Sequence, residues 1–133
     1  MNHTSVVIRC HGNGRAYRPG ETLCGEYWIE SAEPGEVRAV EVSVLWYTAG
    51  KGDEDFAVHD FRRITIDERP GADPRCPGEF STVLPRSPLS YDGQIIKLRW
   101  CVRVRAFLAR GREVIGQYAF RLGSVRPARA VKS

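Results

Sequence analysis

The 133-residue sequence lacks the long apolar runs that would place it in a membrane. No stretch approaches the roughly 20 apolar residues of a membrane span. Residues 1–10 do not combine a basic segment with an apolar one, so we expect no secretory signal and a cytoplasmic location. No window of about a dozen residues repeats apolar side chains at helical spacing without β-branched or turn residues, which argues against long helices.

The sequence also lacks the cysteine and histidine patterns of metal centres. Its four cysteines form no C-x-x-C pair, and no histidine stands at zinc-ligand spacing from any of them. We therefore expect no metal or other cofactor and, in a reducing compartment, no disulfide framework. Thiols in or beside strands act as small apolar side chains, and we expect this of Cys10, Cys24 and Cys101, with Cys76 in a loop.

Catalytic constellations are missing as well. His3, His11 and His59 all lie in the first half of the chain, and no nucleophile-elbow sequence accompanies them. Residues 50–52 read Gly-Lys-Gly but lack the spacer and the following helix of a phosphate loop. We expect that the protein is not an enzyme and that its histidines are incidental surface or turn residues.

What the sequence does contain is a series of β-branched and aromatic runs separated by clusters of Gly, Pro, Asp and Asn. Two runs alternate strictly, and their apolar faces place Trp46 and Trp100 in a core between two sheets. We predict one antiparallel β-sandwich domain over residues 1–124, followed by a basic tail at 125–133 that is expected to be disordered. The seven predicted strands span residues 4–10, 22–30, 36–48, 56–68, 78–84, 94–109 and 112–123.

Two segments resemble conserved stretches of the arrestin-like family, and more narrowly the amino-terminal sandwich of bacterial arrestin-like proteins related to sporulation-control proteins. The first is Tyr-Arg-Pro-Gly-Glu-Thr-Leu-Cys-Gly at 17–25, and the second is Leu-Pro-Arg-Ser-Pro-Leu-Ser-Tyr-Asp-Gly at 84–93. The resemblance implies an immunoglobulin-like (arrestin N-terminal-like) sandwich and an adaptor role. Full arrestins carry two such sandwiches in tandem, whereas this sequence holds one, and a self-associating pair of chains would rebuild the cleft between them.

Residues in these segments also have physical roles of their own. Pro19-Gly20 suits the centre of a type II turn, and Gly25 inside a strand indicates a bulge or a close backbone approach. Pro85 and Pro88 end one strand and stiffen the crossing to the next. We expect Tyr91 to pack its ring over one end of the sandwich.

Charge is distributed unevenly along the chain. Residues 1–92 hold 10 Lys+Arg and 15 Asp+Glu, a net charge of −5, whereas residues 93–133 hold 10 Lys+Arg and one acid, a net charge of +9. Lys97, Arg99, Arg103 and Arg105 alternate along one strand and form a basic stripe on one face. The stripe is either a docking face for phosphate, acidic peptide or anionic lipid, or a solvated face paired with acids such as Glu41.

A second candidate is the acidic hairpin tip formed by Lys51, Asp53, Glu54 and Asp55. It lacks the spacing of a calcium loop, so we interpret it as a solvated tip that is able to carry partner specificity.

These observations predict a non-catalytic protein-interaction module, an adaptor or scaffold that binds partner segments through strand edges or end loops. The alternative is an anion-surface binder that contacts phospholipid or polyanion peripherally through residues 93–133. We expect self-association as well, because the two parts of the chain carry opposite charge. Aromatic side chains near the stripe are too few for us to expect a nucleic-acid partner.

Overall fold

The computed structural model describes residues 3–11, 16–33, 35–50, 54–66 and 78–123. Each of the seven predicted strands matches an observed one, whereas β2 and β7 escaped prediction because two residues are too short to show alternation. The predicted tail at 125–133 lies outside the described residues. The strands are β1 (Ser5–Cys10), β2 (Ala16–Tyr17), β3 (Thr22–Glu30), β4 (Val37–Gly50), β5 (Phe56–Thr65), β6 (Gly78–Val83), β7 (Tyr91–Asp92), β8 (Ile96–Leu108) and β9 (Glu113–Leu122), with a short 3-10 helix η1 (Ala109–Gly111) before β9.

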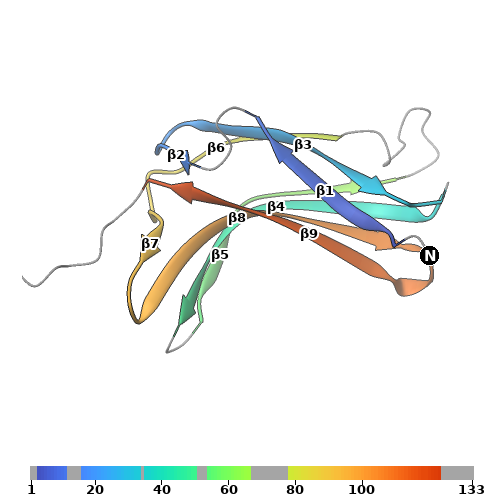
Figure 1. The fold of residues 1–133 in the computed structure, drawn as a ribbon. Coiled ribbons are helices and arrows are strands. Elements are labelled where there is room, and N and C mark those ends of the chain that lie inside the picture. The colour runs from blue at the N-terminus through green and yellow to red at the C-terminus, as the bar shows by residue number, and fades with distance from the viewer. Residues whose placement is uncertain (1–2, 12–15, 34, 51–53, 67–77, 124–133) are drawn as a thin grey trace, which may run out of the picture.

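Within the described residues the strands form two layers (Figure 1). The small sheet has the order β1-β3-β6, and the large sheet has the order β2-β9-β8-β4-β5, with β7 added beside β8. Paired strands are antiparallel, except that β2 runs parallel to β9. The predicted all-β antiparallel sandwich is confirmed. The described part of the chain contains no helix long and apolar enough to cross a membrane.

Alternation along the strands fills the space between the layers. The inward side chains of β4 and β8 are mostly Val and Trp, and the small sheet contributes Leu23, Tyr27 and Ile29. Trp100 is 1% exposed, and its indole Nε1 donates a hydrogen bond to the carbonyl of Pro88 at 2.8 Å. Trp46, directly opposite Trp100 in the ladder, packs against the same core but is only partly buried. At the end of the sandwich where β7 lies, the large sheet extends past the small one (Figure 1).

Two glycines account for the backbone path of residues 17–25. Gly20 has φ of +83°, and the carbonyl of Arg18 accepts a hydrogen bond from the amide of Glu21 at 3.0 Å, which is the geometry of a type II turn. Gly25 lies in the middle of β3, where a Cβ would stand 2.3 Å from the carbonyl oxygen of Arg9 and 2.8 Å from the ring of Phe80. The close approach of β1 therefore requires glycine at this position.

The two sides of the sandwich are closed in different ways. On one side β1 lies so close to β9 that a Cβ at Gly116 would come 2.7 Å from the Cβ of Val6. On the other side, side chains of β5 reach the edge of β6. His59 Nε2 donates to the carbonyl of Val83 at 2.8 Å, and Arg62 donates to the carbonyl of Ser81 at 2.9 Å. The first side is closed by packing and the second by side-chain hydrogen bonds.

The different burial of the two tryptophans generates a stability prediction. Trp100→Ala removes a fully buried side chain and its hydrogen bond to Pro88, so it should lower the free energy of unfolding by about 3–5 kcal/mol. Trp46→Ala should cost clearly less, because part of that side chain is already in water. Urea unfolding followed by circular dichroism measures both, with Trp100→Phe as a milder variant if the alanine variant does not fold. Equal losses at the two positions would contradict this account of the core.

Candidate functional site

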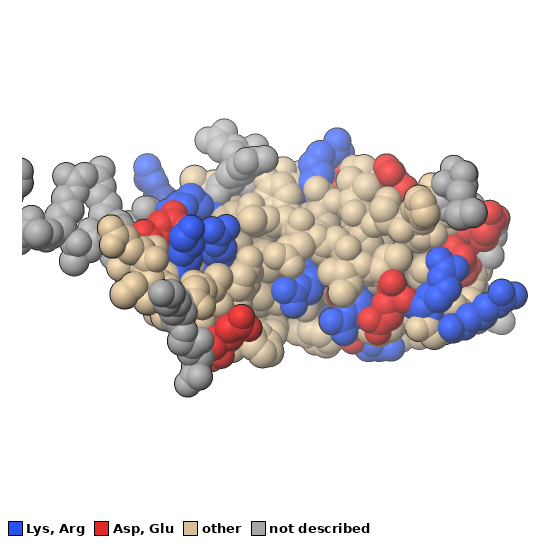
Figure 2. Space-filling model, turned by 60° about the horizontal axis from the view of Figure 1, so that its bottom comes forward, with Lys and Arg blue, Asp and Glu red and all other residues tan. Residues whose placement is uncertain are grey.

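The predicted basic stripe lies on β8 and faces away from the small sheet. Trp100, Val102 and Val104 point into the core, so alternation places Lys97, Arg99, Arg103 and Arg105 on the outer face of the large sheet. Cys101 shares this outer face but is fully buried, and it divides the stripe into two pairs of cations. Figure 2 brings the underside of the molecule in Figure 1 forward and shows uncharged surface over much of the middle, with basic and acidic groups toward both ends.

The acids on this face do not neutralise the stripe. Glu41 stands opposite Arg105 in the ladder, but its carboxylate binds Arg63 of β5 at 2.6 Å. Arg103 donates instead to the neutral amide oxygen of Gln117 at 3.2 Å. Among the described residues, none of the four stripe cations forms an ion pair with an acid. This arrangement favours an unneutralised basic face over a face balanced by its neighbours.

An apolar row crosses the large sheet between the two pairs of cations. Val58, Leu45, Cys101 and Ala119 stand opposite one another on β5, β4, β8 and β9. Leu45 and Cys101 are buried although both lie outside the main core, whereas the ends of the row are exposed. Burial raises the pKa of the Cys101 thiol to about 11, so it remains an uncharged, apolar group at neutral pH.

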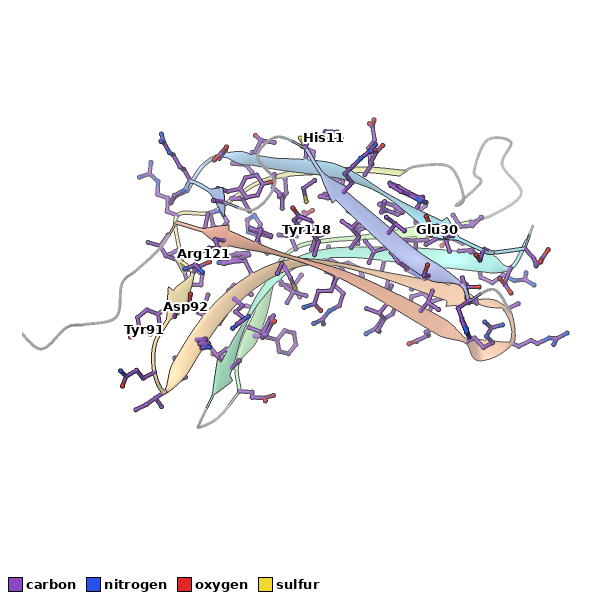
Figure 3. All side chains as sticks on the ribbon, viewed as in Figure 1. His11, Glu30, Tyr91, Asp92, Tyr118 and Arg121 are labelled. Carbon is purple, nitrogen blue, oxygen red and sulfur yellow. The ribbon has the colours of Figure 1, made fainter. Side chains whose placement is uncertain are left out.

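Near the first pair of cations, the end of β9 meets β7. Arg121 binds the carboxylate of Asp92 at 2.8 Å, and the two side chains lie together in Figure 3. The hydrogen bond from Arg121 holds the pKa of Asp92 below its usual value, and the charges of Arg99 and Lys97 lower it further. A hollow of about 310 Å³ opens here between Asp92, Arg99 and Arg121. A second hollow, of about 410 Å³, lies on the other side of Arg99 beside Tyr47 and Lys97.

The edge strand β5 carries an apolar surface that the sequence pattern did not predict. A β-bulge at His59 shifts the register, so that Asp60 stands opposite Val44 but Val58 stands opposite Leu45. Strict alternation would put Phe56 and Val58 on the same face as Ile64, which packs on the core. The bulge turns both outward, beside Phe61, and these three side chains are 65%, 47% and 52% exposed.

The same bulge gives His59 a structural role. Its ring lies edge-on to the indole of Trp100, with 6.0 Å between the ring centroids, and it also bonds β6. His59 is exposed, as predicted for a surface residue, but these contacts show that it is not incidental. The only sequence signal was the break in alternation between Val58 and Phe61.

Other predicted residues lie apart from this face. Lys51 and Asp53 of the acidic tip are outside the described residues. Asp55 lies at the base of its hairpin. Its carbonyl accepts a hydrogen bond from the amide of Thr48, and its amide donates to Thr48 Oγ1, both at 2.8 Å. Tyr91 lies in β7 with its ring against Gly93, where an added Cβ would meet the ring at 2.4 Å.

The thiols and histidines form no metal centre in the part of the chain that the structure describes. No group of three or more His, Cys, Asp or Glu side chains is placed there to hold a metal ion. Cys24 Sγ and His11 Nδ1 are 3.7 Å apart. Burial raises the pKa of the Cys10 thiol to about 11, which suits an apolar packing role.

Comparison with known proteins identifies the fold. No family model matches the sequence, and no curated protein matches it. Among solved structures, Spo0M, the sporulation control protein of Bacillus subtilis, superimposes with a TM-score of 0.62 at 16% identity over 97% of this chain. The match covers 51% of Spo0M, so this chain spans about half the length of that protein. The likeness shows an arrestin-like β fold, in agreement with the sequence resemblance.

A second group of similar structures consists of superoxide reductases. A superoxide reductase (neelaredoxin) from Ignicoccus hospitalis superimposes with a TM-score of 0.54 at 10% identity, over 90% of this chain and 80% of that one. At such identities the similarity extends to the fold alone, because one sandwich supports many unrelated functions.

The pairing of Asp92 with Arg121 predicts a pH effect. Arg121→Gln should raise the pKa of Asp92 toward the ordinary carboxyl value, as measured by ¹³C NMR titration of the Asp92 carboxyl. Because the folded-state pKa lies below the unfolded one, the pair stabilises the fold at neutral pH, and this contribution is lost as the pH falls through the folded-state value. Arg103→Gln removes the same charge from the same face away from Asp92 and should leave that pKa nearly unchanged. An equal rise in both variants would show that overall charge, and not the hydrogen bond, sets the pKa.

Proposed function

We propose that this chain is a non-catalytic protein-interaction module that binds an extended segment of a partner by strand addition to β5. The observation that supports this most directly is the exposure of β5. It pairs with β4 on one side, and no described strand pairs with its other side. Three apolar side chains, Phe56, Val58 and Phe61, project from it into solvent. Unpaired strand edges are templates for another chain.

The other edges of the sandwich are less suited to strand addition. The close contact of Gly116 with Val6 leaves no room for a strand between β9 and β1. On β6, the carbonyls of Ser81 and Val83 are already hydrogen-bonded by Arg62 and His59. Among the described strands, this leaves the long edge strand β5 as the favoured edge for a partner.

Strand addition would divide recognition between backbone and side chains. Main-chain hydrogen bonds to β5 would supply affinity for any extended segment, and pockets or rows for alternate side chains would supply specificity. Phe56 and Val58 precede the bulge and Phe61 follows it, so the exposed row is interrupted at His59. An added segment would contact the two halves of the row with a change of register between them.

The fold supports a regulatory version of this role. Spo0M, which shares the fold, is a sporulation control protein. A chain that takes part in control by binding needs a rigid scaffold and an accessible edge, and this sandwich has both. We therefore propose an adaptor role.

A peptide selection tests the proposal. A random peptide library displayed on phage is panned on the chain, and the enriched peptides are then synthesised. They should protect the amides of β5 from hydrogen exchange, because those amides become part of a new ladder. The double variant Val58→Ser/Phe61→Ser should bind the same peptides about tenfold more weakly, since it removes two apolar contacts.

Ile115→Ser is the matched control. Ile115 is as exposed as Phe61, at 52%, but it lies on β9 at the opposite side of the large sheet. Binding should be unchanged in this variant. Failure to enrich any peptide, or protection confined to strands other than β5, would refute strand addition at this edge.

A further inference from the structure

We infer that the outer face of the large sheet is a docking surface for an acidic polypeptide segment, seated on the apolar row and held by the cations of β8. This inference rests on the proposed role as a protein-interaction module but concerns the outer face of the large sheet, which shares Val58 with the exposed row of β5. The partner segment would be negatively charged and partly apolar.

The outer face of the large sheet carries a net positive charge. In the described strands this face carries six cations and three acids, a net charge of +3. Glu41 and Asp92 are already paired with Arg63 and Arg121. Among the described residues the stripe cations form no ion pair, although Asp92 interacts electrostatically with Arg99 and Lys97. An incoming carboxylate would therefore compete with Asp92 there, and with the neutral contacts of Arg103 and Arg105 elsewhere. The cations are Arg63, Lys97, Arg99, Arg103, Arg105 and Arg121, and the acids are Glu41, Asp92 and Glu113.

The apolar row crosses this face between the cations. Val58 and Ala119 are exposed at its ends, with the buried side chains of Leu45 and Cys101 between them. The row runs across the strands, and the cations stand on both sides of it along β8. Because Leu45 and Cys101 are 3% and 0% exposed, a segment lying across the sheet would meet exposed apolar surface at Val58 and Ala119, and would direct carboxylates toward Arg99 on one side and Arg103 on the other. Apolar contacts beside charged groups are usual in protein interfaces.

The surface around Arg99 is hollowed on two sides. This side chain lies between the two hollows and lines both of them. Its guanidinium is therefore accessible from two directions, and a carboxylate entering either hollow meets a fork of N–H donors suited to bidentate binding. Lys97 adds a second cation to the hollow beside Tyr47, whereas in the other hollow Arg121 is already paired with Asp92, whose carboxylate also lines that hollow.

Other occupants fit the same surface less well. Phe107 is the aromatic side chain on the stripe's strand that faces outward, and the guanidinium groups of Arg63 and Arg105 lie 4.9 Å and 6.0 Å from its centroid. A nucleic-acid base therefore finds this ring already covered. A second copy of the same face would bring two surfaces of net positive charge together. For a lipid surface, the central apolar side chains Leu45 and Cys101 are buried and do not project to insert among acyl chains.

Fluorescence anisotropy with defined peptides tests the inference. The probe is a labelled peptide of alternating glutamate and valine, and the comparison peptides alternate glutamate with glycine or lysine with valine. We expect the glutamate–valine peptide to bind most tightly, the glutamate–glycine peptide more weakly because it makes no apolar contacts, and the lysine peptide not at all. Binding of the first peptide should weaken as salt is raised.

A pair of triple variants separates this face from general attraction. Arg99→Gln/Arg103→Gln/Arg105→Gln should weaken binding about tenfold, since several modest surface ion pairs multiply in the affinity. Arg18→Gln/Arg38→Gln/Arg86→Gln removes the same total charge from exposed positions outside the stripe and should leave the affinity within about twofold. Equal losses in the two triple variants would refute a built surface.

Two further outcomes would also overturn the inference. One is tighter binding of phosphatidylserine vesicles or duplex DNA than of the glutamate–valine peptide, with the same dependence on the stripe arginines. The other is a loss of peptide binding in Val58→Ser/Phe61→Ser but not in the stripe variant, which would assign the peptide to the β5 edge. If the stripe variant loses binding while no library peptide protects β5, the docking surface stands and strand addition fails.

Discussion

The burial of Trp100 is the constraint on which much of the structure depends. An indole can be buried without cost only if its N–H finds an acceptor, and the carbonyl of Pro88 supplies one at 2.8 Å. The segment before β7 is thereby fastened to the middle of β8. Phe120 of β9 packs on the indole with 5.9 Å between centroids, and His59 of β5 meets its edge. The side chain of Trp100 on β8 thus contacts β5, β9 and the segment before β7.

The position of His59 connects that core to the exposed surface. Because the bulge turns His59 toward Trp100 and β6, the residues before it change faces, and Phe56 and Val58 become solvent-exposed. The hydrogen bond from His59 to β6 and the exposed position of Phe56 and Val58 therefore have a common origin in the bulge.

The sequence predicted much of the fold and one part of the candidate site. Alternation of Val, Trp and basic residues over 96–106 sufficed to put the cations on one face of one strand. It did not show which acids would neutralise them, because Glu41 has Arg105 on one side and Arg63 on the other and binds Arg63. Arg121, Asp92 and the exposed part of β5 escaped prediction because their roles depend on strand neighbours that are distant in the chain.

Local chemistry determined the strands, the turn at Pro19-Gly20 and the apolar face around Trp100, since period-2 alternation and the freedom of glycine act over a few residues. The order of strands, the bulge at His59 and the pairing of charges were decided only by tertiary structure. These depend on which backbone groups and side chains meet across the sheet, between positions far apart in the sequence. The all-β character is thus a property of the sequence, whereas the shape and charge of its outer face are properties of the folded chain.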